Sequence, residues 1–66
     1  MPIVQISMVE GRSPEQLRNL IREVTNSVAS TLEAPIDTIK VIVSEVPPTH
    51  WGSAGHTIAD RRNQKI

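Results

Sequence analysis

The residue with the clearest chemical potential is Pro2, which follows Met1 at the head of an apolar stretch, residues 2–9. Methionine aminopeptidases remove Met1 when the next side chain is small, and proline qualifies. Removal would leave a secondary amine, fixed in a ring at the start of a strand. An ordinary α-amino group titrates near ~8, and burial or nearby cations lower its pKa. Because a general base works best with a pKa near the operating pH, we interpret Pro2 as a candidate base.

Three further side chains could act together with Pro2. Arg12 lies in the turn after residues 2–9, Lys40 lies in a second apolar stretch, and Trp51 lies in a segment rich in small residues. Proton abstraction beside a carbonyl builds negative charge on oxygen, which cations in a low-dielectric pocket stabilise. Each residue also has a purely structural interpretation. Arg12 could solvate a turn, Lys40 could be a charge that protects a sheet edge, and Trp51 could anchor an interface.

The composition argues against several classes of protein. Seven basic and seven acidic side chains cancel, and Trp51 is the one aromatic residue, so neither a nucleic-acid surface nor an anionic membrane is a favoured partner. No apolar run approaches the ~20 residues of a membrane span, and the N-terminus lacks the pattern of a secretory signal. Cysteine is absent, and His50 and His56 do not have metal-ligand spacing. We expect a cytoplasmic protein without metal or cofactor.

The pattern along the chain predicts one α+β domain, residues 1–66, made of a single βαβ unit and a C-terminal hairpin. Residues 2–9 and 39–46 are the expected strands, and residues 49–57 have the content of a short hairpin or loop. A strand, a helix and a strand favour a parallel pair with a right-handed crossover. The tail from Ile58 to Ile66 is mostly polar, and its adjacent Arg61 and Arg62 could supply a further carboxylate contact.

The intervening helix has strong local signals at its start. Ser13 suits the N-cap, Pro14 the first helical position and Gln16 the reciprocal capping position. Pro35 should end the helix, because the residue before a proline avoids the α region. One apolar stripe follows at helical spacing, made of Leu17, Leu20, Ile21, Val24, Val28 and Leu32.

So small a chain is expected to need partners of its own kind. A domain of about 60 residues buries only ~60% of its unfolded surface, and a two-stranded βαβ unit leaves its sheet edges open and one sheet face bare. Parallel strands begin at the same end of a sheet, so Pro2 and Lys40 should be close. Arg12 follows the far end of the first strand, about 30 Å from Pro2 at ~3.3 Å per residue. It could reach Pro2 only from a neighbouring subunit.

These residues, in this order, resemble the 4-oxalocrotonate tautomerase (2-hydroxymuconate tautomerase) family of the tautomerase superfamily. The resemblance covers nearly the whole chain. It rests on residues 1–6, 10–16, 20–24, 34–35, 41–45 and 50–52, which read MPIVQI, EGRSPEQ, LIREV, AP, VIVSE and HWG.

The resemblance implies a βαβ fold with a C-terminal hairpin that dimerises through the sheet, and a homohexamer built as a trimer of dimers. It implies that Pro2 shuttles a proton between a dienol and its conjugated ketone, in aromatic compound catabolism. Arg12 would hold the remote carboxylate of the dicarboxylate substrate, and Trp51 would stand where an aromatic residue walls the pocket. Lys40 departs from the family, whose best-known members carry an arginine there. Lysine keeps the charge but loses the planar bidentate fork.

Two other functions stay open. One is a superfamily hydratase or dehalogenase acting on an unsaturated acid, which would need a carboxylate that activates water. Residues 52–55 offer no acid, although Asp37 or Glu10 could contribute from elsewhere. The other is a non-catalytic oligomeric protein that uses a cationic pocket to bind a small anion.

Overall fold

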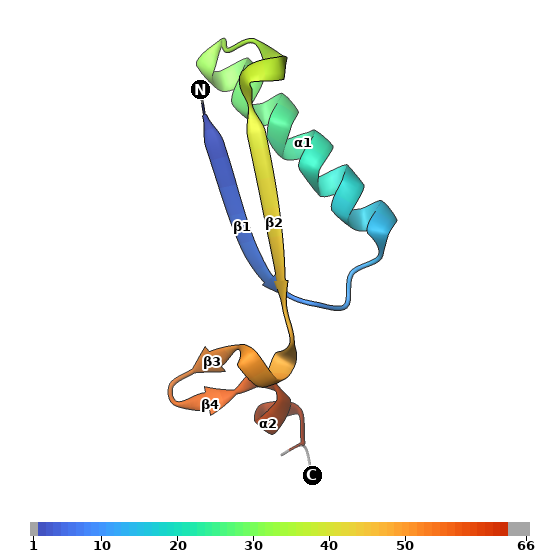
Figure 1. Cartoon of the computed structure of the whole chain (residues 1–66), viewed down its shortest axis with the longest axis vertical. Helices are drawn as coiled ribbons and strands as arrows, with labels where there is room; N and C mark the ends of the chain where they lie inside the picture. The colour runs from blue at the N-terminus through green and yellow to red at the C-terminus, as the bar shows by residue number, and fades with distance from the viewer. Residues whose placement is uncertain (1, 64–66) are drawn as a thin grey trace.

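A computed structural model describes residues 2–63, which form a two-layer βαβ unit followed by a small C-terminal unit (Figure 1). The βαβ unit consists of β1 (Ile3–Val9), α1 (Pro14–Leu32) and β2 (Lys40–Val46). The C-terminal unit holds β3 (Gly52–Ser53), β4 (His56–Thr57) and α2 (Ile58–Asn63). The chain is elongated, with extents of 49 × 24 × 15 Å. Met1 and its expected removal lie outside the described residues, so a single domain spanning residues 1–66 stays a prediction.

The parallel pairing of β1 with β2 confirms the predicted topology. Ile3 lies opposite Lys40, and Val9 lies opposite Val46. Backbone hydrogen bonds continue the pairing beyond both ends. Lys40 N donates to Pro2 O at 3.1 Å, and Glu10 N donates to Val46 O at 2.9 Å. Pro2 is therefore held against the start of β2.

Helix α1 begins as its sequence predicts. The Ser13 hydroxyl accepts a hydrogen bond from Gln16 N at 3.1 Å, and the Gln16 side chain accepts one from Ser13 N at 3.0 Å. The predicted stop before Pro35 is confirmed, and Leu32 is the last helical residue. Glu33 adopts a left-handed conformation, φ 53°, and its N–H donates to Ala29 O. A left-handed cap of this type satisfies the last carbonyls before the proline is reached.

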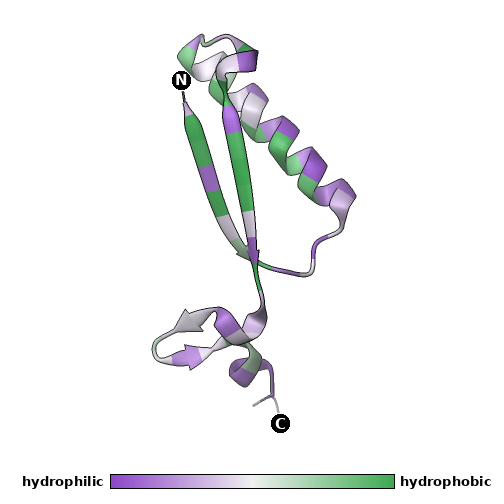
Figure 2. Cartoon of the chain, viewed as in Figure 1, coloured by the Kyte–Doolittle hydropathy of each residue, from purple (hydrophilic) through white to green (hydrophobic). Residues whose placement is uncertain are grey.

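The two faces of the sheet differ in burial. On the first strand, Val4, Ile6 and Met8 are half-buried, whereas Ile3 and Ile42 on the other face are 62% and 47% exposed. Among residues 2–63, Ile39 is the one fully buried hydrophobic side chain. Figure 2 shows hydrophobic colour along much of both strands. Because Ile3 and Ile42 are exposed, part of this apolar surface is uncovered in the single chain.

The predicted stripe on α1 is confirmed for most of its members. Leu17, Leu20, Val24 and Val28 are half-buried, as expected for the face that packs on the sheet. Ile21 and Leu32, which the pattern also assigned to the stripe, remain exposed in this chain. Helical spacing identifies the face of a helix, but the width of the covered strip depends on what packs against it.

The C-terminal unit contains the predicted hairpin and a helix that the sequence analysis did not assign. Ala54 and Gly55, with φ values of 54° and 82°, form the turn between β3 and β4. The tail that reads as polar is helical from Ile58 to Asn63. Thr57 Oγ1 accepts a hydrogen bond from Asp60 N at 3.0 Å and so caps the first turn. Among the described residues no helix is both long and apolar enough to cross a membrane.

The capping box yields a direct prediction about stability. Ser13→Ala should lower the free energy of unfolding by about 1 kcal/mol, because it leaves the Gln16 amide in the first turn of α1 without its acceptor. Chemical denaturation of the two proteins at the same subunit concentration measures the difference. Ser27→Ala, which changes an exposed serine within α1, is the matched control and should not destabilise the chain. Equal losses from both substitutions would contradict a capping role for Ser13.

Candidate active site

The predicted site residues fall into two groups at opposite ends of the β1–β2 sheet. Pro2 is half-buried beside the start of β2, and its carbonyl accepts the hydrogen bond from Lys40 N. The exposed Lys40 side chain donates from Nζ to Asp37 O at 3.3 Å, so it is tethered to its own chain. Binding of an anion by Lys40 would therefore exchange this weak contact for a stronger, charge-assisted one.

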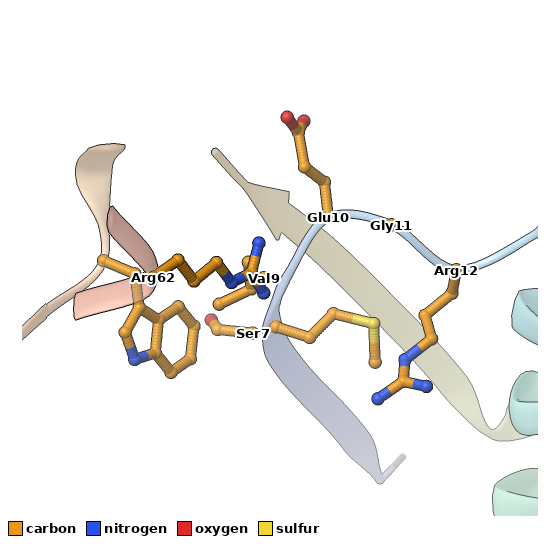
Figure 3. A pocket seen from close by; sticks show the side chains of 8 residues that line it. Ser7, Val9, Glu10, Gly11, Arg12 and Arg62 are labelled. Atoms are coloured by element: carbon orange, nitrogen blue, oxygen red, sulfur yellow. The ribbon is translucent and has the colours of Figure 1, made fainter. Parts of the chain in front are cut away.

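The second group lines a hollow of about 520 Å³ beside the last residues of β1 and the turn that follows. Arg12 and Trp51 both line it, so the structure brings together two of the predicted site residues. The remaining lining residues are Ser7, Met8, Val9, Glu10, Gly11 and Arg62 (Figure 3). The volume falls within the range of small-molecule sites, roughly 300–1,000 Å³.

The turn that carries Arg12 depends on a glycine. Glu10 N is fixed by its hydrogen bond to Val46 O, and the next residue, Gly11, has φ 134°. Residues with a Cβ atom rarely adopt this conformation, whereas glycine does so readily. A Cβ at Gly11 would meet no atom within 4 Å, so the constraint comes from the backbone alone. Gly11 therefore sets the direction in which Arg12 leaves the strand.

Hydrogen bonds within the C-terminal unit position Trp51 and Arg62. Trp51 O accepts from Ile58 N at 2.9 Å, which ties the tryptophan to the first residue of α2. Arg61 Nη2 donates to Ser53 O at 3.3 Å and so joins α2 to the hairpin. Hydrogen bonds therefore connect the half-buried Trp51, the hairpin and the helix that carries Arg62.

The charges around the hollow suit an anion. In Figure 3 the Arg62 side chain extends from its helix toward Val9, and Arg12 enters from the other side of the strand. The carboxylate of Glu10 points away from both arginines. Two guanidinium groups provide planar arrays of donors that match a carboxylate.

A single chain does not bring all four predicted residues together. Arg12 and Trp51 share the hollow, while Pro2 and Lys40 lie at the opposite end of β1. Arg61 and Arg62 were both candidates for a further carboxylate contact, and of these two Arg62 lines the hollow whereas Arg61 does not. Within residues 2–63 no three His, Cys, Asp or Glu side chains are grouped as metal ligands.

Comparison with known proteins gives a consistent result over the whole fold. A family model described as "Tautomerase enzyme" matches residues 2–61. The chain is 46% identical over 57 residues to the 2-hydroxymuconate tautomerase of Stutzerimonas stutzeri, which covers 86% of this chain and 90% of that protein.

Solved structures agree with the sequence comparison. TomN, a 4-oxalocrotonate tautomerase homologue in the tomaymycin biosynthetic pathway, superposes with a TM-score of 0.94 at 34% identity, covering 98% of this chain and all of TomN. A heterohexamer 4-oxalocrotonate tautomerase from Chloroflexus aurantiacus gives a TM-score of 0.87 at 38% identity, with 91% of this chain and 97% of that chain covered. The predicted fold, a βαβ unit with a C-terminal hairpin, is confirmed.

The backbone of Gly11 makes a second prediction. Gly11→Ala should lower the free energy of unfolding by about 1–3 kcal/mol, because alanine is strained at this positive φ. Gly52→Ala is the matched control. A Cβ there would make an ordinary 3.9 Å contact with His56 O, and the backbone requires no glycine. Thermal or denaturant unfolding compares the two variants. A Gly11→Ala protein as stable as Gly52→Ala would contradict the proposed constraint.

Proposed function

The chain belongs to the tautomerase family, and from this premise we propose that Pro2 is the base of its isomerase reaction. The substrate we propose is an unsaturated dicarboxylate of the 2-hydroxymuconate type, in keeping with the named relative of 46% identity. The observation that carries the proposal is the placement of Pro2, held at the sheet end by the Lys40 hydrogen bond. Arg12, Lys40 and Trp51 are the proposed substrate-binding residues.

The proposed reaction moves one proton and needs no change of oxidation state. The neutral amine of Pro2 takes the proton from the enol oxygen, and the electron pair moves along the conjugated chain toward carbon. The ammonium that forms then protonates that carbon, which gives the conjugated ketone and restores the amine. Proton transfer by a positioned group of this kind contributes typically about 10²–10⁴-fold to the rate.

The cations have a defined part in this scheme. Negative charge develops along the conjugated system as the enol proton leaves, and positive groups beside it stabilise that charge. Arg12 would bind the remote carboxylate, and Lys40 would lie beside the carboxylate and oxygen near Pro2. Positive charge near the Pro2 amine also lowers its pKa, which keeps the base neutral at working pH.

A second copy of the chain is needed to assemble such a site. The β1 strand pairs with β2 on one edge, and its other edge lacks a partner strand among the described residues. An isologous contact along this edge would run two β1 strands antiparallel. The start of one β1 would then lie beside the end of the other, so that Arg12 of one copy approaches Pro2 of its neighbour.

The apolar surface supports self-association. Ile3 and Ile42 are exposed on the uncovered sheet face, and Ile39 alone is fully buried among residues 2–63. A chain of this size is marginal without oligomerisation or another cross-link. A relative of known structure is a heterohexamer, and we propose that this chain likewise forms a hexamer, built as three dimers.

The two other functions receive less support. A hydratase requires a carboxylate that activates water, and Figure 3 shows the Glu10 carboxylate directed away from Arg12 and Arg62. A protein that only binds anions would need no basic amine at its N-terminus. Catalysis by Pro2 therefore discriminates between the candidates.

The test is the ketonisation of 2-hydroxymuconate, followed by ultraviolet absorbance. Pro2→Ala should lower kcat by about 10²-fold, because alanine supplies a primary amine that is not held in a ring. An N-terminal extension that keeps the Pro2 nitrogen in an amide bond should abolish turnover, since an amide nitrogen is not basic. Mass spectrometry of each preparation establishes which residue is N-terminal. Equal rates for the wild-type protein and Pro2→Ala would reject the mechanism, and wild-type protein without turnover would favour a binding protein.

A further inference from the structure

A short 3₁₀ helix, η1 (Ile36–Thr38), connects α1 to β2 at the end of the sheet where β1 begins (Figure 1). Thr38 N donates to Pro35 O at 3.0 Å, and the Thr38 hydroxyl donates to the same carbonyl at 2.6 Å. The next backbone bond, from Ile39 N to Ile36 O, is longer, at 3.3 Å. Because hydrogen bonds in 3₁₀ helices have poorer geometry than those in α-helices, the Thr38 hydroxyl reinforces a turn that its backbone bonds hold weakly.

The residues after this turn connect it to Pro2. Ile39 is 7% exposed, so the chain that leaves η1 is fixed by burial. Lys40 comes next, and its N–H donates to Pro2 O. The Lys40 side chain turns back and donates from Nζ to Asp37 O in the turn. Lys40 therefore contacts Pro2 through its main chain and η1 through its side chain.

The anchored carbonyl of Pro2 restricts the ring nitrogen of the same residue. The peptide group is planar and rigid, and the pyrrolidine ring contains the bond from the nitrogen to Cα. The bond from Cα to the carbonyl carbon is therefore the one rotatable bond between the hydrogen-bonded oxygen and the nitrogen. Whatever moves the carbonyl also moves the nitrogen.

We propose that Thr38 is a positioning residue for the Pro2 amine, acting through η1 and the Lys40 main chain. This inference rests on the proposed function for the chemistry of Pro2. It goes further by giving the turn between α1 and β2 a part in that chemistry. A misplacement of about 1 Å can cost about 10²-fold in rate, so a looser turn should slow proton transfer.

Amide hydrogen exchange tests the positioning without depending on turnover. Thr38→Val removes the hydroxyl but keeps the branched side chain and the backbone bond to Pro35 O. The Lys40 amide should then exchange about fivefold faster, because the turn loses one hydrogen bond. The Glu10 amide, which donates to Val46 O at the other end of the sheet, is the internal reference and should be unchanged. Equal acceleration of both amides, or no acceleration of the Lys40 amide, would overturn the proposal.

Thr25→Val is the matched control. Thr25 is half-buried like Thr38, and its hydroxyl also donates to a main-chain oxygen, Ile21 O, at 2.7 Å. It lies within α1, away from the turn that precedes β2. Thr25→Val should leave the exchange of the Lys40 amide at the wild-type rate. An acceleration equal to that of Thr38→Val would contradict a specific role for Thr38.

Ketonisation of 2-hydroxymuconate supplies a second readout. Thr38→Val should lower kcat about tenfold and change KM less than about twofold, because the base is displaced while Arg12 keeps its place at the other end of the sheet. Thr38→Ser, which restores a hydroxyl, should recover most of kcat together with the slow exchange of the Lys40 amide. A Thr38→Val protein with wild-type kcat would overturn the proposal, and so would a Thr38→Ser protein as slow as Thr38→Val.

Failure of the proposed function has a different signature. Pro2→Ala would then leave ketonisation unchanged, whereas the Lys40 amide would still report whether Thr38 holds the Pro2 carbonyl. An accelerated Lys40 amide in Thr38→Val, combined with full activity of Pro2→Ala, would reject the proposed function alone.

Discussion

The parallel pairing of β1 with β2 is the constraint from which the rest of the molecule follows. The hydrogen bond from Lys40 N to Pro2 O holds Pro2 against the start of β2. Arg12 follows the other end of β1 and therefore lies at the far end of the sheet. The crossover helix makes this order unavoidable, because parallel strands cannot be joined by a tight turn. One chain therefore carries two proposed half-sites, a base at one end and a hollow for an anion at the other.

The same constraint couples stability to the proposed catalysis. A two-stranded sheet with one helix covers a single face, so Ile3 and Ile42 stay exposed and the free edge of β1 can accept another strand. A second copy that covers these groups would also carry Arg12 to Pro2. The contact between two copies would then both bury apolar surface and assemble the site. Association would therefore stabilise this small chain and make it active at the same time.

Local signals in the sequence were sufficient for the βαβ unit, whereas long-range packing decided the remainder. Ser13, Pro14 and Gln16 act within one turn, so the helix start was predictable. The left-handed Glu33 was not, because glutamate carries no preference for that conformation. The helix α2 reads as a polar tail, and the structure distinguishes its two arginines, because Arg61 donates to Ser53 O whereas Arg62 lines the hollow. The roles proposed for Pro2, Arg12, Lys40 and Trp51 remain predictions.

The most direct measurement asks whether two defective subunits can repair each other. Pro2→Ala and Arg12→Ala proteins, refolded together in equal amounts, would form mixed dimers in which one site receives Pro2 from one chain and Arg12 from the other. Random mixing restores about a quarter of the sites of a two-fold symmetric dimer. The account predicts ketonisation well above the sum of the separate variants. A mixture no more active than that sum, in dimers shown by mass spectrometry to be mixed, would contradict a site shared between chains.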